Sequence, residues 1–404
     1  MDCGLVQERP ALVSGQSAYC ARCNLRLARH YPAGFERSLA LSLSALVFLL
    51  VASLTPFLDF AFHGRRSTAY LWSGMEMLWE TGFQPLSLLV GLTVLFVPFF
   101  LVLGLAAVTA PLLIGRCPPY VSLVYRWLRK LRPWAMLEVF LLGVLVAVVK
   151  LGDLASISLD VGFYAFVLAS LLMLAAWETL DPHGVWDRVG VARIPEEIGT
   201  PNADRLAGCP ICELRSEIPE SAGSDFGCPR CGEPLESRKP HSIQRALALL
   251  MAAIVLYLPA NLLPVMRIDL LGHSENDTIL EGVQALIVGG LWEIAALVFF
   301  ASFLVPGLKI IGLLYLAWVV RHPSPRRSIF QTRLFRVIDQ IGRWSMIDVF
   351  MTAVLVGLVQ LGSIATILAA PGAICFAAVV VLTIFAARSF DPRALWDAVE
   401  EMDG

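Results

Sequence analysis

Charged residues are scarce in this sequence. Only 16% of its 404 residues are charged, whereas 57% are hydrophobic and the mean hydropathy is +0.71. Because soluble domains carry about 25% charged residues, a soluble fold is excluded as the main architecture. The sequence also lacks the G-x-x-x-x-G-K-[ST] pattern, which excludes direct use of ATP through a loop of that kind.

The sequence instead contains several long runs without charged residues. They cover 39–58, 86–115, 246–266 and 349–387, and each reaches the roughly 20 residues that cross a hydrocarbon core. A polar segment with cysteines precedes the first run, unlike the short charged start of a signal peptide, so we expect it to remain in the mature protein. We predict eight membrane spans, at 37–58, 86–115, 135–152, 161–179, 244–264, 291–320, 345–364 and 371–388.

Positive charge is distributed unevenly between the loops. Segments 116–132 and 321–343 hold five and six Lys or Arg residues, whereas 59–85 and 267–290 together hold Arg65, Arg66 and Arg267. Since Lys and Arg in short loops favour the cytoplasmic side, the first two segments should be cytoplasmic and the other two periplasmic. We therefore expect an inner-membrane protein with both termini and the central region 181–241 on the cytoplasmic side.

The membrane region is duplicated. Residues 134–187 match 344–397 at a constant offset of 210, and upstream positions match at an offset of 208. Because both copies have the same spans and enter the membrane from the same side, we expect parallel repeats about an axis along the membrane normal. Equivalent pairs include Gly74/Gly282, Pro98/Pro306, Gly104/Gly312, Trp134/Trp344, Phe140/Phe350, Asp181/Asp391 and Trp186/Trp396.

Four cysteines between the two copies form the pattern C-x2-C-x15-C-x2-C. They are Cys209, Cys212, Cys228 and Cys231. This spacing lets two cysteine knuckles converge on one tetrahedral zinc ion. A closed four-thiolate site leaves no position for water or substrate, so we predict structural zinc. Cytoplasmic thiols are more often metal ligands than disulfides, which agrees with the predicted orientation.

The amino-terminal copy of the ribbon is incomplete. It offers Cys3, Cys20 and Cys23, and a partner three residues before Cys3 would precede Met1. Three interpretations are open: a true start upstream of Met1, which we favour, a fourth ligand such as His30, or a ribbon without metal. The metal ligands predicted for this copy are the three cysteines.

The fold class follows from these patterns. We predict an all-α integral membrane protein with two tandem repeats of four transmembrane helices, each preceded by a small zinc-ribbon. The predicted domains are 1–36 (incomplete zinc-ribbon), 37–190 (first four-helix unit), 191–240 (second zinc-ribbon) and 241–404 (second four-helix unit). After the fourth span of each unit, Asp-Pro-x-x-x-Trp-Asp predicts a short helix with Asp as its N-cap.

Several motifs together resemble the paraquat-inducible protein A family of Gram-negative inner-membrane proteins. Besides the second ribbon, they are His241-Ser242-Ile243-Gln244, the segment 258–264 (LPANLLP), Asp277-Thr278-Ile279-Leu280 with Gly282, the segment 341–348 (IGRWSMID) and Leu395-Trp396-Asp397-Ala398. The resemblance covers almost the whole chain and departs from the family at the shortened first ribbon. It implies a partner with periplasm-spanning MCE domains (mammalian cell entry type), whose hydrophobic tunnels carry lipids between membranes.

Ionisable residues inside the predicted spans are few. They are costly in hydrocarbon and usually face a protein interior or a water-filled path. Lys309 lies mid-span and needs compensation, while Lys150 and Asp153 lie three apart near a predicted periplasmic end. Glu138 and Asp348 occupy equivalent positions, where interfacial capping is the simpler interpretation. For the other three, structural and functional roles are both open.

The two copies differ in these charges. Lys309 aligns with Leu101, Lys150 with Gln360, Asp153 with Ser363 and Asn261 with Leu58. A duplicated scaffold with unmatched polar residues indicates an asymmetric polar site, which is suited to carrying protons. Pro98, Pro259, Pro264 and Pro306 interrupt spans, and the freed carbonyls must find partners. Segments 121–131 and 328–338 mix cations with apolar residues, as is typical of interfacial helices on an anionic leaflet.

The leading hypothesis is a lipid-transport subunit that exchanges lipid with an MCE-type partner's tunnel. The alternative is a structural anchor or assembly platform for that partner. A membrane redox enzyme is disfavoured because the clear cysteine pairs belong to ribbon-type sets, so we expect no enzymatic activity. We expect membrane lipids and the MCE-domain protein as partners, and no nucleic acid.

Overall fold

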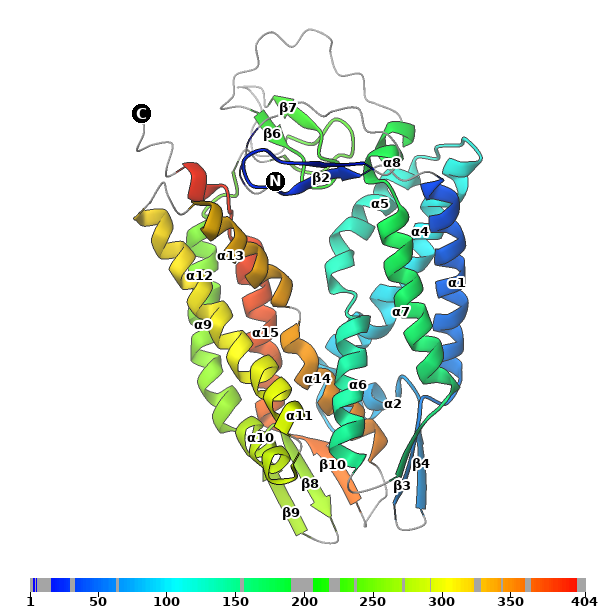
Figure 1. Cartoon of the computed structure of the whole chain (residues 1–404), viewed down its shortest axis with the longest axis vertical. Coiled ribbons are helices and arrows are strands. Elements are labelled where there is room, and N and C mark those ends of the chain that lie inside the picture. The colour runs from blue at the N-terminus through cyan, green and yellow to red at the C-terminus, as the bar shows by residue number, and fades with distance from the viewer. Residues whose placement is uncertain are drawn as a thin grey trace.

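The computed structural model (Figure 1) contains two helical halves, with small cysteine-bearing hairpins at one end and β-sheets at the other. The first is called the ribbon end and the second the sheet end. The residues described are Cys3, Leu5, 16–29, 33–62, 65–152, 156–189, 206–217, 226–235, 238–270, 273–290, 292–322, 328–342, 344–359 and 365–397.

The first half comprises the helices between residues 34 and 189. They are α1 (Gly34–Leu54), α2 (Ser73–Glu80), α3 (Gln84–Gly91), η1 (Leu92–Phe96), α4 (Val97–Leu113), α5 (Tyr120–Leu131), η2 (Arg132–Trp134), α6 (Leu137–Gly152), α7 (Val161–Thr179) and α8 (Pro182–Val189).

The second half repeats this order. Its helices are α9 (Ser242–Leu262), α10 (Ile279–Val288), α11 (Trp292–Val298), η4 (Phe299–Leu304), α12 (Val305–Arg321), α13 (Ser328–Ile341), η6 (Trp344–Met346), α14 (Ile347–Leu358) and α15 (Pro371–Ser389).

Eight helical stretches in the described part of the chain are long and apolar enough to cross a membrane. This confirms the predicted number of spans, and α7 has the predicted bounds at both ends. The third and seventh stretches, 120–149 and 329–358, begin earlier than predicted because α5 and α13 continue into them. The chain is therefore a duplicated eight-span helical protein.

The two halves meet through equivalent residues. The rings of Phe140 on α6 and Phe350 on α14 lie 5.7 Å apart with an interplanar angle of 74°. Helices α6 and α14 pack directly against each other. A contact between a residue and its own repeat counterpart places the halves about an approximate twofold axis, as expected for parallel repeats.

Two of the four predicted proline interruptions, at Pro98 and Pro306, are accommodated by π-helical turns. The π-helices η1 and η4 end directly before Val97-Pro98 and Val305-Pro306. Proline removes one backbone donor and crowds the preceding turn, and a wider turn relieves that crowding. The helices continue beyond each proline, so these prolines shape the spans without ending them.

Helices α5 and α13 have protein neighbours on their apolar faces. A Cβ at Gly104 would lie 2.6 Å from Leu128 of α5, and one at the equivalent Gly312 would lie 2.5 Å from Ile338 of α13. Gly104 and Gly312 therefore allow α5 to pack closely against α4 and α13 to pack closely against α12. These segments, which the sequence predicts to be interfacial helices, therefore also pack against the second and sixth spans.

Two three-stranded antiparallel sheets lie at the sheet end, where the sequence analysis predicted only loops. Strands β3 (Leu58–Phe62), β4 (Arg65–Ala69) and β5 (Ser156–Leu159) form the order β4-β3-β5. Strands β8 (Met266–Leu270), β9 (His273–Asp277) and β10 (Ala365–Ala369) form the equivalent order β9-β8-β10. In each half, the sheet pairs two strands from the loop after the first span with one strand from the loop before the last span.

The ribbon end carries two short hairpins. Strands β1 (Ser17–Tyr19) and β2 (Arg26–Arg29) belong to the first ribbon, and β6 (Leu206–Gly208) and β7 (Arg215–Glu217) belong to the second. The aspartate of each Asp-Pro motif caps the turn that follows it, as predicted. Asp181 Oδ1 accepts a hydrogen bond from the His183 N–H, and Asp391 Oδ1 accepts one from the Arg393 N–H. In the first half this motif begins α8.

Candidate functional site

The four cysteines of the second ribbon converge. The sulfurs of Cys209, Cys212, Cys228 and Cys231 all lie within 4.8 Å of one another, and all four residues are buried. The pairs Cys209–Cys231 and Cys212–Cys228 are each 3.4 Å apart. A tetrahedral site with Zn–S bonds of about 2.3 Å separates its sulfurs by about 3.8 Å, so this geometry fits a metal ion of that size.

The hydrogen bonds between the four cysteines lower the pKa of Cys209 and Cys228 and raise the pKa of Cys212 and Cys231. A hydrogen bond from the Cys212 thiol lowers the pKa of Cys209 to about 7. The backbone N–H of Cys212 also points at the Cys209 sulfur, at 3.5 Å. Because metals bind the thiolate and not the thiol, this arrangement is suited to metal binding.

The first ribbon gathers three buried cysteines. Cys3, Cys20 and Cys23 lie within 4.8 Å of one another, with Cys3 Sγ 3.6 Å from Cys20 Sγ. Burial raises the pKa of Cys20, but hydrogen bonds from the backbone N–H groups of Cys23 and Arg22 outweigh it and lower the pKa to about 7. His30 lies outside the described residues. The three sulfurs form a partial metal site.

The second ribbon packs on the first half of the membrane region. Arg126 of α5 donates a hydrogen bond to the Cys231 carbonyl at 3.4 Å, and Lys130 pairs with Glu233 at 2.7 Å. Arg129 pairs with Glu213 at 3.1 Å. The cations of α5 therefore hold a ribbon that precedes the second half in the sequence.

The first ribbon packs on the second half. Arg336 of α13 donates hydrogen bonds to the Cys23 carbonyl and the Cys23 sulfur, each at 3.1 Å. The Arg22 guanidinium lies over the Trp396 ring, 4.1 Å from its centroid. Its cysteines share an apolar cluster with α9, α12 and α15. The two ribbons are thus crossed, because each contacts the half that it does not precede.

Lys309 lies where the sequence placed it, inside a span. Its side chain is 3% exposed, and its Nζ has no hydrogen-bond partner among the described residues. A Cβ at Gly342 would lie 2.5 Å from that Nζ, so the amine rests directly against the backbone after α13. Asp339 and Arg388 lie within its Coulombic reach.

The other predicted polar residues do not form one cluster around Lys309. Asn261 donates from Nδ2 to the Tyr257 carbonyl at 2.7 Å, near the end of α9. Asp348 is 3% exposed and lines a small pocket with Asp277 and Thr278 at the sheet end, whereas the equivalent Glu138 is exposed. Asp153 and the side chain of Lys150 lie outside the described residues.

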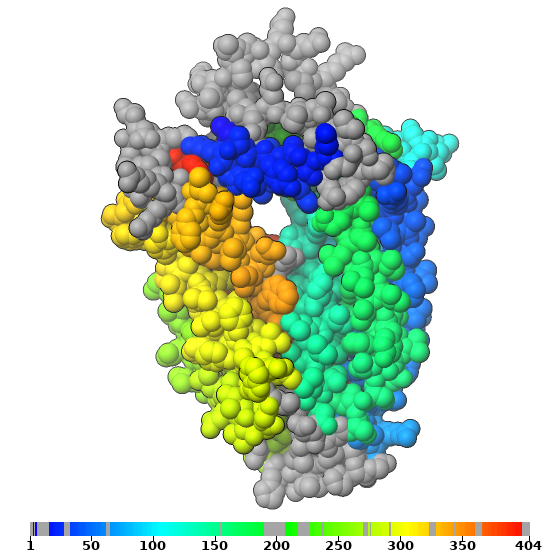
Figure 2. Space-filling view, in the orientation of Figure 1, coloured from blue at the N-terminus to red at the C-terminus, as the bar shows by residue number. Residues whose placement is uncertain are grey.

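A cavity of about 680 Å³ lies between the halves beneath the ribbons. Ligand sites commonly measure about 300 to 1,000 Å³. Figure 2 shows an opening between the halves directly below the first ribbon, bordered by α13 on one side and by helices of the first half on the other. The residues that line the cavity come from both ribbons, α5, α13, α15 and the segments beside them. They are Leu25, Arg26, Leu27, Arg129, Gly208, Cys209, Pro210, Glu213, Glu233, Pro234, Lys239, Phe335, Asp339, Ala387, Arg388, Phe390, Asp391, Pro392 and Arg393.

The family model for paraquat-inducible protein A matches residues 35–190 and 243–400, which are the two halves. The chain belongs to the paraquat-inducible protein A family. This match confirms the resemblance seen in the motifs and the two-repeat organisation.

Relatives of the family match over nearly the whole chain. The intermembrane transport protein PqiA of Escherichia coli (strain K12) is 36% identical over 99% of this chain and 95% of that protein. The lipophilic envelope-spanning tunnel protein A of the same strain is 32% identical over 98% and 90%. A probable intermembrane transport protein of Haemophilus influenzae is 28% identical over 95% and 92%. No solved structure matches. This member of the paraquat-inducible protein A family is a multi-pass membrane protein.

Sequence reasoning missed further polar residues inside the second half of this family member, among them the half-buried Tyr257. Tyr257 donates its hydroxyl to the Phe303 carbonyl of η4 at 2.9 Å, which satisfies a backbone group at the π-helix as the proline argument required. Ser302 and Thr352 are buried. The offsets of 208 and 210 align these two with Val94 and Leu142. Aligning the halves position by position would have revealed that these polar residues have apolar counterparts in the first half.

Proposed function

We propose that this protein is the inner-membrane subunit of an MCE-type system that transports lipids between the inner and outer membranes. The observation that carries the proposal is the lateral opening between the two halves, which leads into the 680 Å³ cavity. We propose that a lipid from the surrounding bilayer enters the cavity through this opening. The relatives named as intermembrane transport and envelope-spanning tunnel proteins support the same reading.

We propose that the ribbon end is cytoplasmic and the sheet end periplasmic. The cation-rich segments 116–132 and 321–343 contain α5 and α13 at the ribbon end, and the positive-inside rule assigns such segments to the cytoplasmic side. The periplasm-spanning MCE-domain partner then docks at the sheet end. We retain the division into 1–36, 37–190, 191–240 and 241–404.

We propose zinc as the metal of the second ribbon, with a structural role. Four buried thiolates form a closed site of the softness and size that zinc prefers. The first ribbon's three cysteines hold a second ion when a fourth ligand is supplied. Metal at either site fixes the ribbons that cover the cavity.

We propose that polar residues inside the membrane support transport. Lys309 is the central residue. A buried amine without a hydrogen-bond partner in the described chain destabilises the fold, and residues retained at such a cost in a membrane are usually functional. Lys150 and Asp153 belong to the same proposal from sequence alone. Asn261, Glu138 and Asp348 are its remaining members. None is proposed as a catalytic residue, since the relatives' names describe transport.

A reconstituted transfer assay tests the proposal. The protein is placed in donor vesicles with a fluorescent phospholipid, and its copurified MCE-domain partner bridges them to acceptor vesicles. We expect transfer to require both proteins. A complex that forms but leaves transfer at the rate of the partner alone would favour the structural-anchor alternative.

A further inference from the structure

The approximate twofold axis relates two lateral interfaces between the halves, one on each side of the contact between α6 and α14. In the first interface, α2 and α3 of the first half pack against α14 and α15 of the second half. The equivalent second interface lies between α10 and α11 of the second half and α6 and α7 of the first half. In a symmetric molecule the cavity would be equally accessible from both sides.

The first interface is packed backbone against backbone near the sheet end. A Cβ at Gly74 of α2 would overlap the Ala353 carbonyl of α14, and one at Gly357 would lie 2.5 Å from the Gly74 nitrogen. Small residues allow helices to approach this closely in a membrane. Because neither glycine position has room for a methyl group, no lipid chain fits between α2 and α14 here.

An aromatic and cationic contact closes the same interface nearer the ribbon end. The Trp134 ring of η2 packs against the Phe385 ring of α15, with 5.6 Å between the centroids. The Arg388 guanidinium lies over the same Trp134 ring, 5.0 Å from its centroid, and Arg388 also lines the cavity. A guanidinium over an aromatic ring is an attractive contact. These side chains therefore join the two halves at the wall of the cavity.

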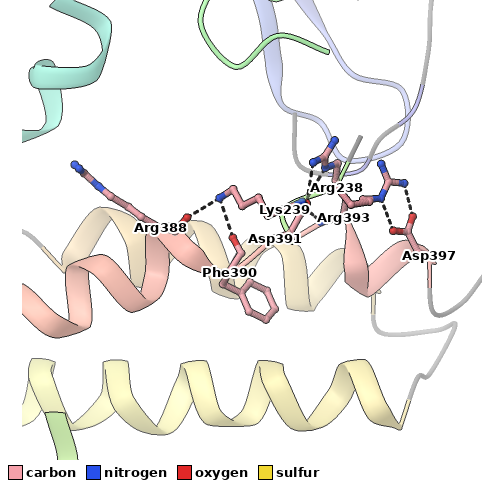
Figure 3. A network of polar contacts seen from close by, with 7 residues as sticks. All are labelled: Arg238, Lys239, Arg388, Phe390, Asp391, Arg393 and Asp397. Carbon is pink, nitrogen blue, oxygen red and sulfur yellow. Dashed lines mark hydrogen bonds and ion pairs between the residues drawn. The ribbon is translucent and has the colours of Figure 1, made fainter. Parts of the chain in front are cut away.

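Figure 3 shows how the end of α15 is held for this contact. Lys239 donates from Nζ to the backbone carbonyls of Arg388 and Phe390. A lysine at a helix C-terminus satisfies carbonyls that lack a donor within the helix. The Arg388 side chain extends away from the Asp391 and Asp397 carboxylates, toward the first half. The segment that links the second ribbon to α9 thus fixes the backbone from which Arg388 reaches Trp134.

The second interface has different residues at the equivalent positions. Trp344 is the counterpart of Trp134, but the offset of 210 aligns Phe385 with Ala175 and Arg388 with Glu178. The α7 positions that correspond to the ring and the cation of α15 therefore carry a methyl group and a carboxylate. The contact that closes the first interface cannot form at the second.

The second interface also differs near the sheet end. Gly357 of α14 aligns with Ala147 of α6, whose methyl group occupies the space that Gly357 leaves for α2. Helix α10, the counterpart of α2, packs against α11 and η4 of its own half. Its residues Leu280, Ile287 and Val288 are exposed. The sequence therefore favours a looser interface on this side.

The opening in Figure 2 lies at the second interface. It is bordered by α13, which leads into η6, whereas η2 belongs to the closed interface. Trp344, the first residue of η6, is 48% exposed, whereas Trp134 of η2 is half-buried. The asymmetry in the sequence and the opening in the structure thus fall on the same side of the molecule.

We propose that membrane lipid enters the cavity from one side only, at the interface that Trp344 and Ala175 border. Trp134, Phe385 and Arg388 keep the opposite side closed. This deepens the proposed lipid transport by naming the side of entry, and it rests on that proposed function. Entry is measured by labelling of the cavity wall, which does not require transfer to a partner.

Crosslinking across each interface tests the proposal. An entrance pair combines Trp344→Cys with Ala175→Cys, and a closed pair combines Trp134→Cys with Phe385→Cys. Each pair is bridged by a reducible bifunctional thiol reagent in full-length protein in nanodiscs. A photoreactive phospholipid is then added, and mass spectrometry measures labelling of segment 25–27, which lines the cavity. Bridging the entrance pair should abolish labelling until the bridge is reduced, whereas bridging the closed pair should leave labelling unchanged.

The native cysteines need their own control. Both pairs are introduced together with Cys117→Ser and Cys375→Ser, which remove the two cysteines outside the ribbon clusters. The parent protein with only these two changes receives the same reagents. Any effect of reagent on the buried ribbon cysteines then appears in the parent and is subtracted.

A second variant tests the entrance without a crosslink. Ala175→Phe places at the entrance the ring that Phe385 supplies on the closed side, and it should abolish labelling of segment 25–27. The matched control is Ala107→Phe, which adds the same ring to an exposed alanine of α4 that does not line the cavity. This control should label like the parent.

Each outcome decides the proposal. Labelling that persists when the entrance pair is bridged, or in Ala175→Phe, would overturn the one-sided entrance. Loss of labelling when the closed pair is bridged would also overturn it, because the opposite side would then have to open. Absence of labelling in the unbridged parent would show that lipid does not enter this cavity. The expected labelling without lipid transfer in the complete system would contradict the proposed function and leave the entrance intact.

Discussion

Arg126 and Arg336 occupy equivalent positions in the two halves, and each donates a hydrogen bond to the carbonyl of the last cysteine of the ribbon that precedes the other half. The acceptors, Cys231 and Cys23, are themselves equivalent. The crossed arrangement therefore follows the same approximate twofold axis as the Phe140–Phe350 contact. Because each ribbon connects to one half by the chain and to the other by these contacts, the ribbons link the halves over the cavity.

We predict that these two arginines hold the ribbons in place. Arg126→Ala and Arg336→Ala together should accelerate amide hydrogen exchange in β1, β2, β6 and β7, because each loses a charge-assisted hydrogen bond worth about 1.5 to 3 kcal/mol. That range corresponds to roughly 10- to 150-fold faster exchange through local opening. Arg37→Ala, which alters an exposed cation on α1, is the control. Unchanged exchange in the double variant would show that the ribbons are held by other contacts.

Metal content can be predicted from the two cysteine clusters. Purified protein should contain zinc, and Cys209→Ser or Cys231→Ser should remove the ion of the second ribbon, because zinc requires the four thiolates for a closed site. Elemental analysis provides the measurement. Cys117→Ser, which changes an exposed cysteine outside both clusters, should keep the metal. Absence of zinc above background in the unaltered protein would refute the assignment.

Topology gives an independent prediction. Single cysteines placed in the segment between α12 and α13 should be labelled by an impermeant thiol reagent only after the inner membrane is opened. Cysteines placed in β4 or β9 should be labelled in intact spheroplasts. This follows from the cation distribution between the loops. Labelling of the α12–α13 segment from the periplasm would reverse the proposed orientation.

Asp391 should contribute a pH-dependent part of the stability. Burial raises its pKa, but hydrogen bonds from Arg393 and the Lys239 N–H outweigh burial and hold the pKa below the usual 3.8. A carboxylate whose pKa is lowered by folding contributes stability above its unfolded pKa and loses it as the pH falls through the folded pKa. Asp391→Asn should therefore reduce the free energy of unfolding at pH 7 by about 2 kcal/mol, a deficit that shrinks below about pH 4.

Thermal unfolding in detergent, followed across pH, measures this effect. The matched control is Asp397→Asn, because Asp397 pairs with Arg238 at the surface, where an ion pair contributes at most about 1 kcal/mol. A deficit that stays constant down to pH 3 would indicate that Asp391 acts through packing and not through its charge.

The duplicated spans could be predicted from the sequence because each depends on local hydropathy. Strands such as β3 and β5 could not, since a strand of four or five residues carries too little periodicity and their partners are far apart in the chain. The crossed ribbons depend on contacts between residues separated by more than 100 positions. Likewise, Glu138 and Asp348 align in the repeat, but only the packing around each decides that one is exposed and the other buried.

The residue that best separates transport from scaffolding is Lys309. Its amine is 3% exposed and has no hydrogen-bond partner among the described residues, and the first half has Leu101 at this position. Replacing a poorly compensated buried charge with an apolar residue of similar length commonly stabilises a fold by about 1 to 3 kcal/mol. Lys309→Met should therefore raise the unfolding temperature in detergent while abolishing lipid transfer with the partner bound. Leu101→Met, the same final residue at the equivalent position, should leave transfer unchanged. Transfer at the unaltered rate in Lys309→Met would exclude this lysine from the transport site.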